Sequence, residues 1–309
     1  MRKIVPSLHF LENFMPIFSK TSFMLTCLQK AAEIPFYQAV ELGFIFDIQG
    51  RQEVRKIVEA RNWQETQWVS PVIAERGLSL SSLDTEKRQK AVQLAKELIA
   101  GAVEAGATRV GLQSGPDLGD AKRDEAKKAL IESCLVLAEE AKQFPQLFLL
   151  IEPLDRYVHK KQLLGPIAET VAWFDALKKD APNFFIHWDS AHEKLGGVDL
   201  LASMQLAAPH MAQFHICNCV DAPDHPYYGD FHMDVGQAPD FQTWGYLTPE
   251  VGASMLKCAQ NFAPLAEIPY TTCALEVRAH LGDDLWAKER LIRQFLMKTF
   301  DLAGITYNV

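Results

Sequence analysis

The stretch Leu147-Phe-Leu-Leu-Ile-Glu-Pro-Leu-Asp-Arg156 decides the fold. Five apolar residues run directly into Glu152, and Pro153 follows. A continuous apolar run of this length is typical of a strand buried on both faces. Because Pro153 has no backbone N–H, we expect the strand to end at about Glu152. A carboxylate at the C-terminal end of a buried parallel strand lies where parallel α/β proteins place their functional groups.

Strand-like and helix-like segments alternate eight times along the chain, with no linker or break in composition. Predicted strands cover residues 4–10, 44–48, 67–73, 108–112, 147–152, 184–188, 211–217 and 272–277. Predicted helices cover residues 24–42, 51–62, 84–105, 120–143, 167–178, 199–207, 249–262 and 284–303. Alternation of this kind predicts an α/β protein with a parallel sheet, and eight units in 309 residues favour a closed (β/α)₈ TIM barrel.

We expect one domain over residues 1–309, with a long loop at about 218–248 that is rich in Asp, Pro, Gly, His and aromatic residues. An open dinucleotide-binding sheet would need a glycine-rich turn after its first strand. The sequence Ser7-Leu-His-Phe-Leu-Glu12 bears no likeness to such a turn. The closed barrel is therefore the preferred fold.

The composition disfavours several classes of partner. The formal net charge is −8 and the pI is about 5.6, which argues against nucleic acid because phosphate backbones require a basic surface. No run approaches the 18 apolar residues of a membrane span, and the first residues read as a strand rather than as a signal peptide. The six cysteines show no paired spacing. We therefore expect a reduced, cytoplasmic setting without membrane or nucleic-acid partners.

Four consecutive predicted strands, the fifth to the eighth, end in potential metal ligands: Glu152, Asp189, His215 and Glu276. Any one of these residues alone could be a helix cap or a surface charge. Strand ends of one parallel barrel meet at one rim, so the four together predict a shared site. Three carboxylates and one imidazole suit Mn²⁺ first, with Mg²⁺, Co²⁺ or Zn²⁺ as alternatives.

These segments resemble the xylose isomerase-like barrel superfamily, and within it the ketose 3-epimerases of the D-tagatose 3-epimerase type. Ile151–Tyr157 is similar to their Glu-Pro-Leu-Asn-Arg-Tyr segment, and Trp188–His192 to their Asp-x-x-His. Phe214–Ile216 and Leu275–Val277 resemble their seventh-strand histidine and last-strand glutamate. The resemblance covers nearly the whole chain in element order and is weak before residue 80.

The resemblance implies one divalent ion held by Glu152, Asp189, His215 and Glu276, with Glu152 and Glu276 also carrying protons. It implies an isomerase or epimerase that acts on a ketose or related keto-polyol through an enediolate. A small-molecule sugar would be the partner, and a homo-oligomer, dimer or tetramer, is the implied assembly. A keto-inositol dehydratase-like lyase, an apurinic endonuclease-like metal enzyme and a non-catalytic sugar-binding barrel are the alternatives.

Departures from the family pattern leave the choice of substrate open. Val158 stands where the epimerases carry a substrate-contacting glutamate, and Asp221 stands near the place of a loop arginine. His192 would hold the oxygens of the substrate, or act as a capping histidine beside the site. Arg278 would bind a hydroxyl, carboxylate or phosphate, or neutralise the carboxylates.

Gly229–Gly236 resembles the Asp-x-His-x-x-x-Gly segment of the metal-dependent apurinic endonucleases. There, this loop joins the Asp-x-x-His histidine around a further metal, which here would mean Asp230, His232 and His192. The histidines that those enzymes also need at the third and fourth strand ends are missing. A second ion remains an alternative, and the preferred reading is a lid whose Asp230 and His232 contact substrate or a partner subunit.

Overall fold

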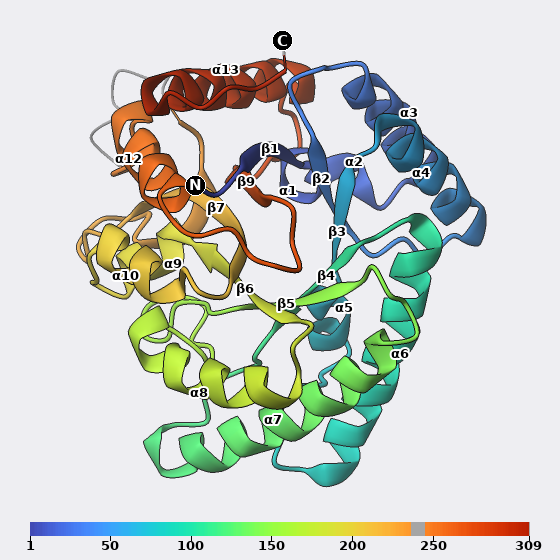
Figure 1. Ribbon diagram of the computed structural model, residues 1–309, viewed down its shortest axis with the longest axis vertical. Coiled ribbons are helices and arrows are strands. Elements are labelled where there is room, and N and C mark those ends of the chain that lie inside the picture. Colours follow the sequence, from blue (N-terminus) through green and yellow to red (C-terminus); the bar gives the residue numbers. More distant parts are fainter. Residues whose placement is uncertain (236–244, 309) are drawn as a thin grey trace.

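A computed structural model describes residues 1–235 and 245–308. Eight parallel strands close into a barrel, as the sequence predicted (Figure 1). Hydrogen-bonded pairs run from β1 through β6, β7 joins β6 to β9, and β9 returns to β1. The barrel strands are β1 (Ile4–His9), β2 (Ala39–Gly43), β3 (Gln64–Trp68), β4 (Arg109–Gln113), β5 (Phe148–Glu152), β6 (Phe184–Asp189), β7 (Met211–Val220) and β9 (Thr271–Glu276).

Helices surround the barrel, and both chain ends lie with β1 and α13 (Figure 1). The helices are α1 (Phe10–Asn13), α2 (Met15–Phe18), α3 (Thr21–Ala32), α4 (Ile48–Arg61), α5 (Ser70–Glu75), α6 (Thr85–Ala105), α7 (Asp120–Ala141), α8 (Ile167–Asp180), α9 (Ser190–Leu195), α10 (Leu200–Ala207), α12 (Pro249–Gln260) and α13 (Leu285–Ala303). None of the helices in the described ranges has the length and apolar character needed to cross a membrane.

The long helix α6 shows how local sequence sets the element boundaries. The side chain of Asp84 accepts a hydrogen bond from the backbone N–H of Lys87 and so begins the helix. Gly106 ends it in the left-handed conformation, at φ 106°, which costs glycine no strain. The predicted helix over 84–105 is confirmed.

The prediction for the second strand was wrong. The strand is β2, Ala39–Gly43, and the predicted strand at 44–48 is instead the connection into α4. Glu41 interrupts the apolar pattern of the true strand, whereas Phe44 to Ile48 looks strand-like although Phe46 is 62% exposed. Gly43 is the last residue of β2, and a Cβ there would lie 2.9 Å from side-chain atoms of Leu11 and Phe18. The predicted helix over 24–42 was too long, because α3 ends at Ala32.

The third strand was also misplaced. It is β3, Gln64–Trp68, and most of the predicted stretch 67–73 belongs to the turn of α5. The strand carries polar residues on both faces, with Thr66 bonded to Gln213 inside the barrel and Glu65 bonded to Gln67 outside it. A hydrophobic pattern cannot identify such a strand. The strand was therefore predicted at the apolar residues that follow it.

Residues 218–248 hold more structure than the sequence suggested. β7 extends to Val220, and β8 (Gly229–Met233) returns antiparallel to it. This hairpin lies beyond the barrel rim and carries Asp230 and His232. Gly236, the last residue of the endonuclease-like segment, lies outside the described residues.

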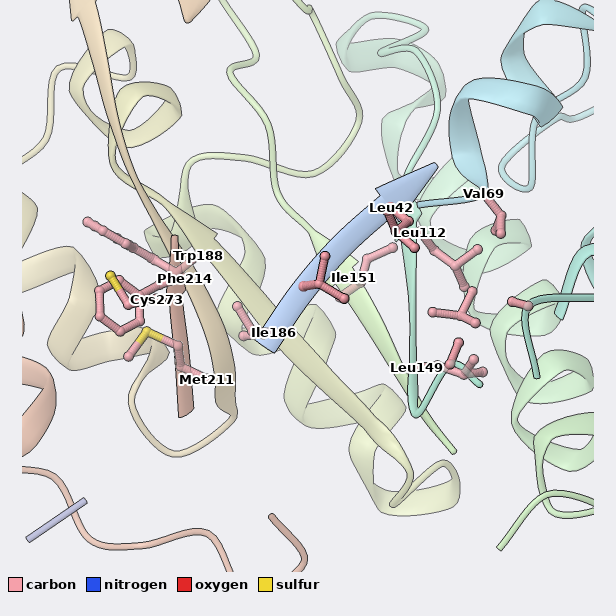
Figure 2. Packing of buried hydrophobic residues seen from close by; sticks show 14 of the residues in the cluster. Leu42, Val69, Leu112, Leu149, Ile151, Ile186, Trp188, Met211, Phe214 and Cys273 are labelled. Atoms are coloured by element: carbon pink, nitrogen blue, oxygen red, sulfur yellow. The ribbon is translucent and has the colours of Figure 1, made fainter. Parts of the chain in front are cut away.

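The main core fills the space between barrel and helices (Figure 2). Successive side chains of a strand point to opposite faces. Apolar residues therefore pack outward against the helices, and the residues between them face the barrel interior. On β6, Ile186 and Trp188 belong to this outer core, while His187 and Asp189 face inward. The same alternation places Phe214 outside and His215 inside on β7.

Candidate metal centre and pocket

The C-terminal rim brings together three of the four predicted ligands. Donor atoms of Glu152, Asp189 and His215 lie within 4.8 Å of one another, in a group whose fourth member is His187. All four side chains are buried. Asp189 pairs in register with His215 across β6 and β7, which explains their proximity.

Glu276, the fourth predicted ligand, lies beside this group. Its Oε2 is 2.9 Å from Nδ1 of His215, and its Oε1 is 3.0 Å from Nδ1 of His232. It belongs to three overlapping donor groups: one with His9 and His215, one with Glu12 and His232, and one with Asp189 and Cys217. The structure therefore places Glu276 at the same rim, two strands along the barrel from Asp189.

Glu41 is a part of the site that sequence reasoning missed. Its Oε2 accepts hydrogen bonds from Nε2 of Gln213 at 2.7 Å and Nε1 of Trp68 at 3.1 Å, and lies 2.8 Å from Nε2 of His215. Its Oε1 accepts from the hydroxyl of Ser7 at 3.0 Å. The missing signal was the strand itself, because β2 was predicted five residues too late, at 44–48, and so did not include Glu41.

His187 and His9 were missed as well. His187 lies two positions before Asp189 on β6, and therefore on the same face of the strand. His9 ends β1 and lies 3.9 Å from Oε1 of Glu276. The period of two along β6 could have identified His187 from the sequence, and the end of the first strand could have identified His9.

The donor set fits a divalent cation. Asp189 uses Oδ1 to cap α9, accepting from the backbone of Ala191 and His192, while Oδ2 is buried with no hydrogen-bond partner among the described residues. A buried, unpartnered carboxylate oxygen is costly unless a cation satisfies it. Carboxylates and imidazoles are the ligands that Mn²⁺, Co²⁺ and Zn²⁺ take in proteins.

Burial and neighbouring charge shift the carboxylates in different directions. Burial raises the pKa of Glu152 to about 7 and also raises the pKa of Asp189. Burial opposes ionisation of Glu276 too, but the imidazoles of His232 and His9 outweigh it and hold the pKa of Glu276 well below its usual value. Glu152 therefore binds a proton more tightly than Glu276 does.

The three residues considered for a second ion are only partly brought together. Nε2 of His232 lies 2.8 Å from Oδ2 of Asp230, whereas Nδ1 of His192 lies 3.5 Å from Oδ2 of Asp155. Nζ of Lys160 lies 3.0 Å from Asp230 Oδ2, so an ammonium already supplies positive charge there. Burial alone would lower the pKa of His192, but the carboxylates of Asp230 and Asp155 raise it to about 9.

Arg278 forms a bidentate ion pair with Glu12 at the pocket wall. Its Nε lies 2.7 Å from Glu12 Oε2 and its Nη2 lies 3.0 Å from Glu12 Oε1. Nη2 also lies 3.4 Å from Nδ1 of His232. Arg278 thus neutralises Glu12, a carboxylate outside the four predicted ligands, and it holds a fixed position at the pocket.

These groups surround a pocket of about 400 Å³ at the C-terminal rim. Glu152, Lys160, His192, His232, Glu276 and Arg278 are among the residues that line it. A volume of this size is in the range of small-molecule sites. The pocket offers charged and polar side chains from several strands to one ligand.

Comparisons with known proteins agree on the architecture. A family model described as xylose isomerase-like TIM barrel matches residues 28–252. A structure of L-ribulose 3-epimerase has a TM-score of 0.68 at 16% identity, with 98% of this chain and 96% of that chain covered. D-psicose 3-epimerase from Clostridium cellulolyticum H10 has a TM-score of 0.67 at 12% identity, with 98% of each chain covered.

A structure titled AP endonuclease, family 2, from Brucella melitensis is also similar, with a TM-score of 0.63 at 17% identity and coverage of 96% of this chain and 99% of that chain. A search of curated protein sequences found no match. Identities this low establish a shared fold alone.

Proposed function

Because the chain belongs to the xylose isomerase-like TIM barrel family, we propose that it is a divalent-metal-dependent isomerase or epimerase of a ketose or related keto-polyol. The observation that carries the proposal is the position of Glu152 and Glu276. They come from β5 and β9, with Asp189 and His215 from the two strands between them, and both line the pocket. Two glutamates that reach one pocket from separate strands suit chemistry with one proton donor and one acceptor.

In this proposal Glu152, Asp189, His215 and Glu276 hold one divalent ion, for which Mn²⁺ is the first expectation and Mg²⁺, Co²⁺ and Zn²⁺ are alternatives. The bound ion would supply Lewis-acid polarisation of a substrate carbonyl. The unpartnered Oδ2 of Asp189 supports a cation at this point of the rim.

The two glutamates would move the proton. One glutamate removes the proton from the carbon beside the carbonyl, which gives an enediolate. In an epimerase the other glutamate returns a proton to the opposite face, and in an isomerase one proton moves between neighbouring carbons. Trp68, Leu11 and Pro71 supply part of the apolar wall of the same pocket.

The substrate-binding roles go to His192, Arg278, Asp230 and His232. His192, His232 and Arg278 line the pocket. Asp230 would act through His232, because its Oδ2 lies 2.8 Å from Nε2 of His232. The guanidinium of Arg278 and the ammonium of Lys160 stand on the pocket wall, although each is already paired with a carboxylate. This balance favours a neutral sugar over a free polyanion and supports a small-molecule partner rather than nucleic acid.

The test is uptake of solvent deuterium at the carbon beside a ketose carbonyl, measured across a panel of free and phosphorylated ketoses, inosose and hydroxypyruvate. Glu152→Gln and Glu276→Gln should each lose exchange by about 100-fold or more while metal remains bound. Glu65→Gln is the matched control, because Glu65 is a buried glutamate on β3 outside the pocket.

Each alternative has its own outcome. Normal exchange in both glutamine variants would overturn the acid/base pair. A dehydrated product formed in proportion to substrate consumed would indicate the lyase. Metal and sugar binding without any exchange would indicate a sugar-binding barrel, and cleavage at abasic sites would indicate the endonuclease.

A further inference from the structure

His187 is a buried imidazole that the four-ligand set leaves unused. It is on β6, 0% exposed, and faces the barrel interior below Asp189. Neither ring nitrogen has a hydrogen-bond partner within the described part of the chain. A buried polar group without a partner is uncommon and calls for a ligand, an ion or water.

The surroundings of His187 fix its ring rather than satisfy its nitrogens. The ring packs edge-on against Trp68, with centroids 4.9 Å apart, and against His215, with centroids 4.0 Å apart. Its Nε2 lies 3.6 Å from Oε1 of Glu152, which is too long for a hydrogen bond. Aromatic contacts of this kind hold the imidazole in place while leaving its lone pair available.

The spacing of the donor atoms suits a common ion. Donors that each lie about 2.0–2.2 Å from one metal are at most about 4.4 Å apart. The donor atoms of Glu152, His187, Asp189 and His215 lie within 4.8 Å of one another, close to this limit. Among the groups found in the described chain, this is the one with four members.

We infer that His187 is a metal ligand, so that the ion of the proposed function is held by two imidazoles together with the rim carboxylates. The inference rests on that proposed function for the presence of an ion, and it adds a consequence for which ion is bound. Imidazole favours Zn²⁺, Co²⁺ and other late transition ions, whereas Mg²⁺ and Mn²⁺ favour oxygen. A second imidazole therefore moves the preference of the site toward Co²⁺ and Zn²⁺.

The experiment measures binding of Co²⁺, Zn²⁺ and Mn²⁺ to the full chain after removal of metal by a chelator, in the absence of sugar. His187→Leu should weaken binding of Co²⁺ and Zn²⁺ by at least about 100-fold, since loss of a ligand costs at least as much as loss of a group that orients one. Binding of Mn²⁺ should weaken less, so the Co²⁺-to-Mn²⁺ affinity ratio falls. His210→Gln is the control, because His210 pairs with Asp175 outside the pocket.

A second measurement does not depend on the folding of a variant. X-ray absorption of the Zn²⁺-loaded wild-type chain should show scattering from two imidazoles. One imidazole in that spectrum, or wild-type Co²⁺ affinity in a folded His187→Leu variant, would overturn the inference, as would a wild-type chain that binds none of these ions. Two imidazoles without deuterium exchange on any sugar would leave the inference standing and overturn the proposed reaction.

Discussion

Glu41 and Glu276 hold His215 from opposite sides of its ring. Oε2 of Glu41 lies 2.8 Å from Nε2, and Oε2 of Glu276 lies 2.9 Å from Nδ1. Nδ1 also lies 3.8 Å from Oδ2 of Asp189, so this nitrogen is the one that faces the predicted ligands. A carboxylate behind a metal-binding histidine fixes its tautomer and ring orientation. Glu41 therefore has the position of a residue that would direct the lone pair of Nδ1 toward the proposed ion.

We expect Glu41→Gln to keep the fold but weaken metal binding by about 10–100-fold. The oxygen of a glutamine can still accept from Trp68 and Gln213, and the hydroxyl of Ser7 can turn to accept from its amide. The negative charge behind His215 is lost, however. Calorimetric titration with Mn²⁺ and Co²⁺, together with the melting temperature, separates these two effects.

Glu41→Ala serves as the contrasting variant. It leaves the buried donors of Gln213, Trp68 and Ser7 without their acceptor, so the free energy of unfolding should fall by about 2–4 kcal/mol in addition to the loss of metal affinity. A Glu41→Gln variant that binds metal as the wild type does would show that Glu41 only stabilises the barrel interior.

The sequence predicted the site best where outward residues are apolar. On β5, β6, β7 and β9 the outer face packs against helices, so the apolar pattern located each strand and its predicted ligand. β3 lacks this pattern because Glu65 and Gln67 face outward. β2 has only two apolar outward residues, Val40 and Leu42, and the predicted helix over 24–42 covered them. Because β2 was misplaced, the sequence did not predict the contact of Glu41 with His215.

A different limit applies to contacts between distant segments. The approach of Lys160 to Asp230 joins the loop after β5 to the hairpin strand β8, and neither segment has a periodic pattern. Arg278 was placed at the pocket by the sequence, yet its partner Glu12 comes from α1, at the other end of the chain. Closure of the barrel brings these segments together. A local sequence pattern cannot predict contacts between segments so far apart in the chain.

We expect one tightly bound ion per chain rather than two. The ammonium of Lys160 lies 3.0 Å from Oδ2 of Asp230 and would repel a cation placed between Asp230, His232 and His192. Metal analysis of the purified chain after dialysis should give a stoichiometry near one. Lys160→Met provides the comparison, because a second ion that appears only in this variant would confirm that the ammonium excludes it. Two ions in the wild type would contradict the prediction.

Gly111 leaves room for Trp68 inside the barrel. A Cβ at Gly111 would lie 2.2 Å from the indole ring, whose nitrogen donates to Glu41 and whose face packs on His187. Gly111→Ala should therefore lower the free energy of unfolding by about 1–3 kcal/mol and weaken metal binding through the displaced indole. Urea denaturation and metal titration measure the two effects.

A double-mutant cycle tests the cause of that loss. Trp68→Leu removes the ring that the new methyl group would meet, so the combined variant should be less destabilised than the sum of the two single changes. Strict additivity would mean that Gly111→Ala acts through its own backbone rather than through Trp68.

Glu65 should make stability depend on pH independently of the metal site. Burial raises the pKa of Glu65 from its usual 4.5 to about 8, and its Oε2 has no hydrogen-bond partner among the described residues. Because the folded state holds this proton more tightly than the unfolded state, stability is lost as the pH rises from about 4.5 toward 8. Glu65→Gln keeps the shape and stays neutral, so it should exceed the wild type in stability at pH 8 by on the order of 2 kcal/mol and by little at pH 5.

The measurement is urea unfolding of both chains at pH 5 and pH 8 in the presence of a chelator, so that metal binding does not enter the difference. Glu86→Gln is the control, because Glu86 is an exposed glutamate on α6 that pairs with Lys90 at the surface. Equal loss of stability in the wild type and Glu65→Gln across this range would mean that the pH dependence arises elsewhere. The buried carboxyls of Glu152 and Glu193, whose pKa values burial raises to about 7, would then be the groups to test.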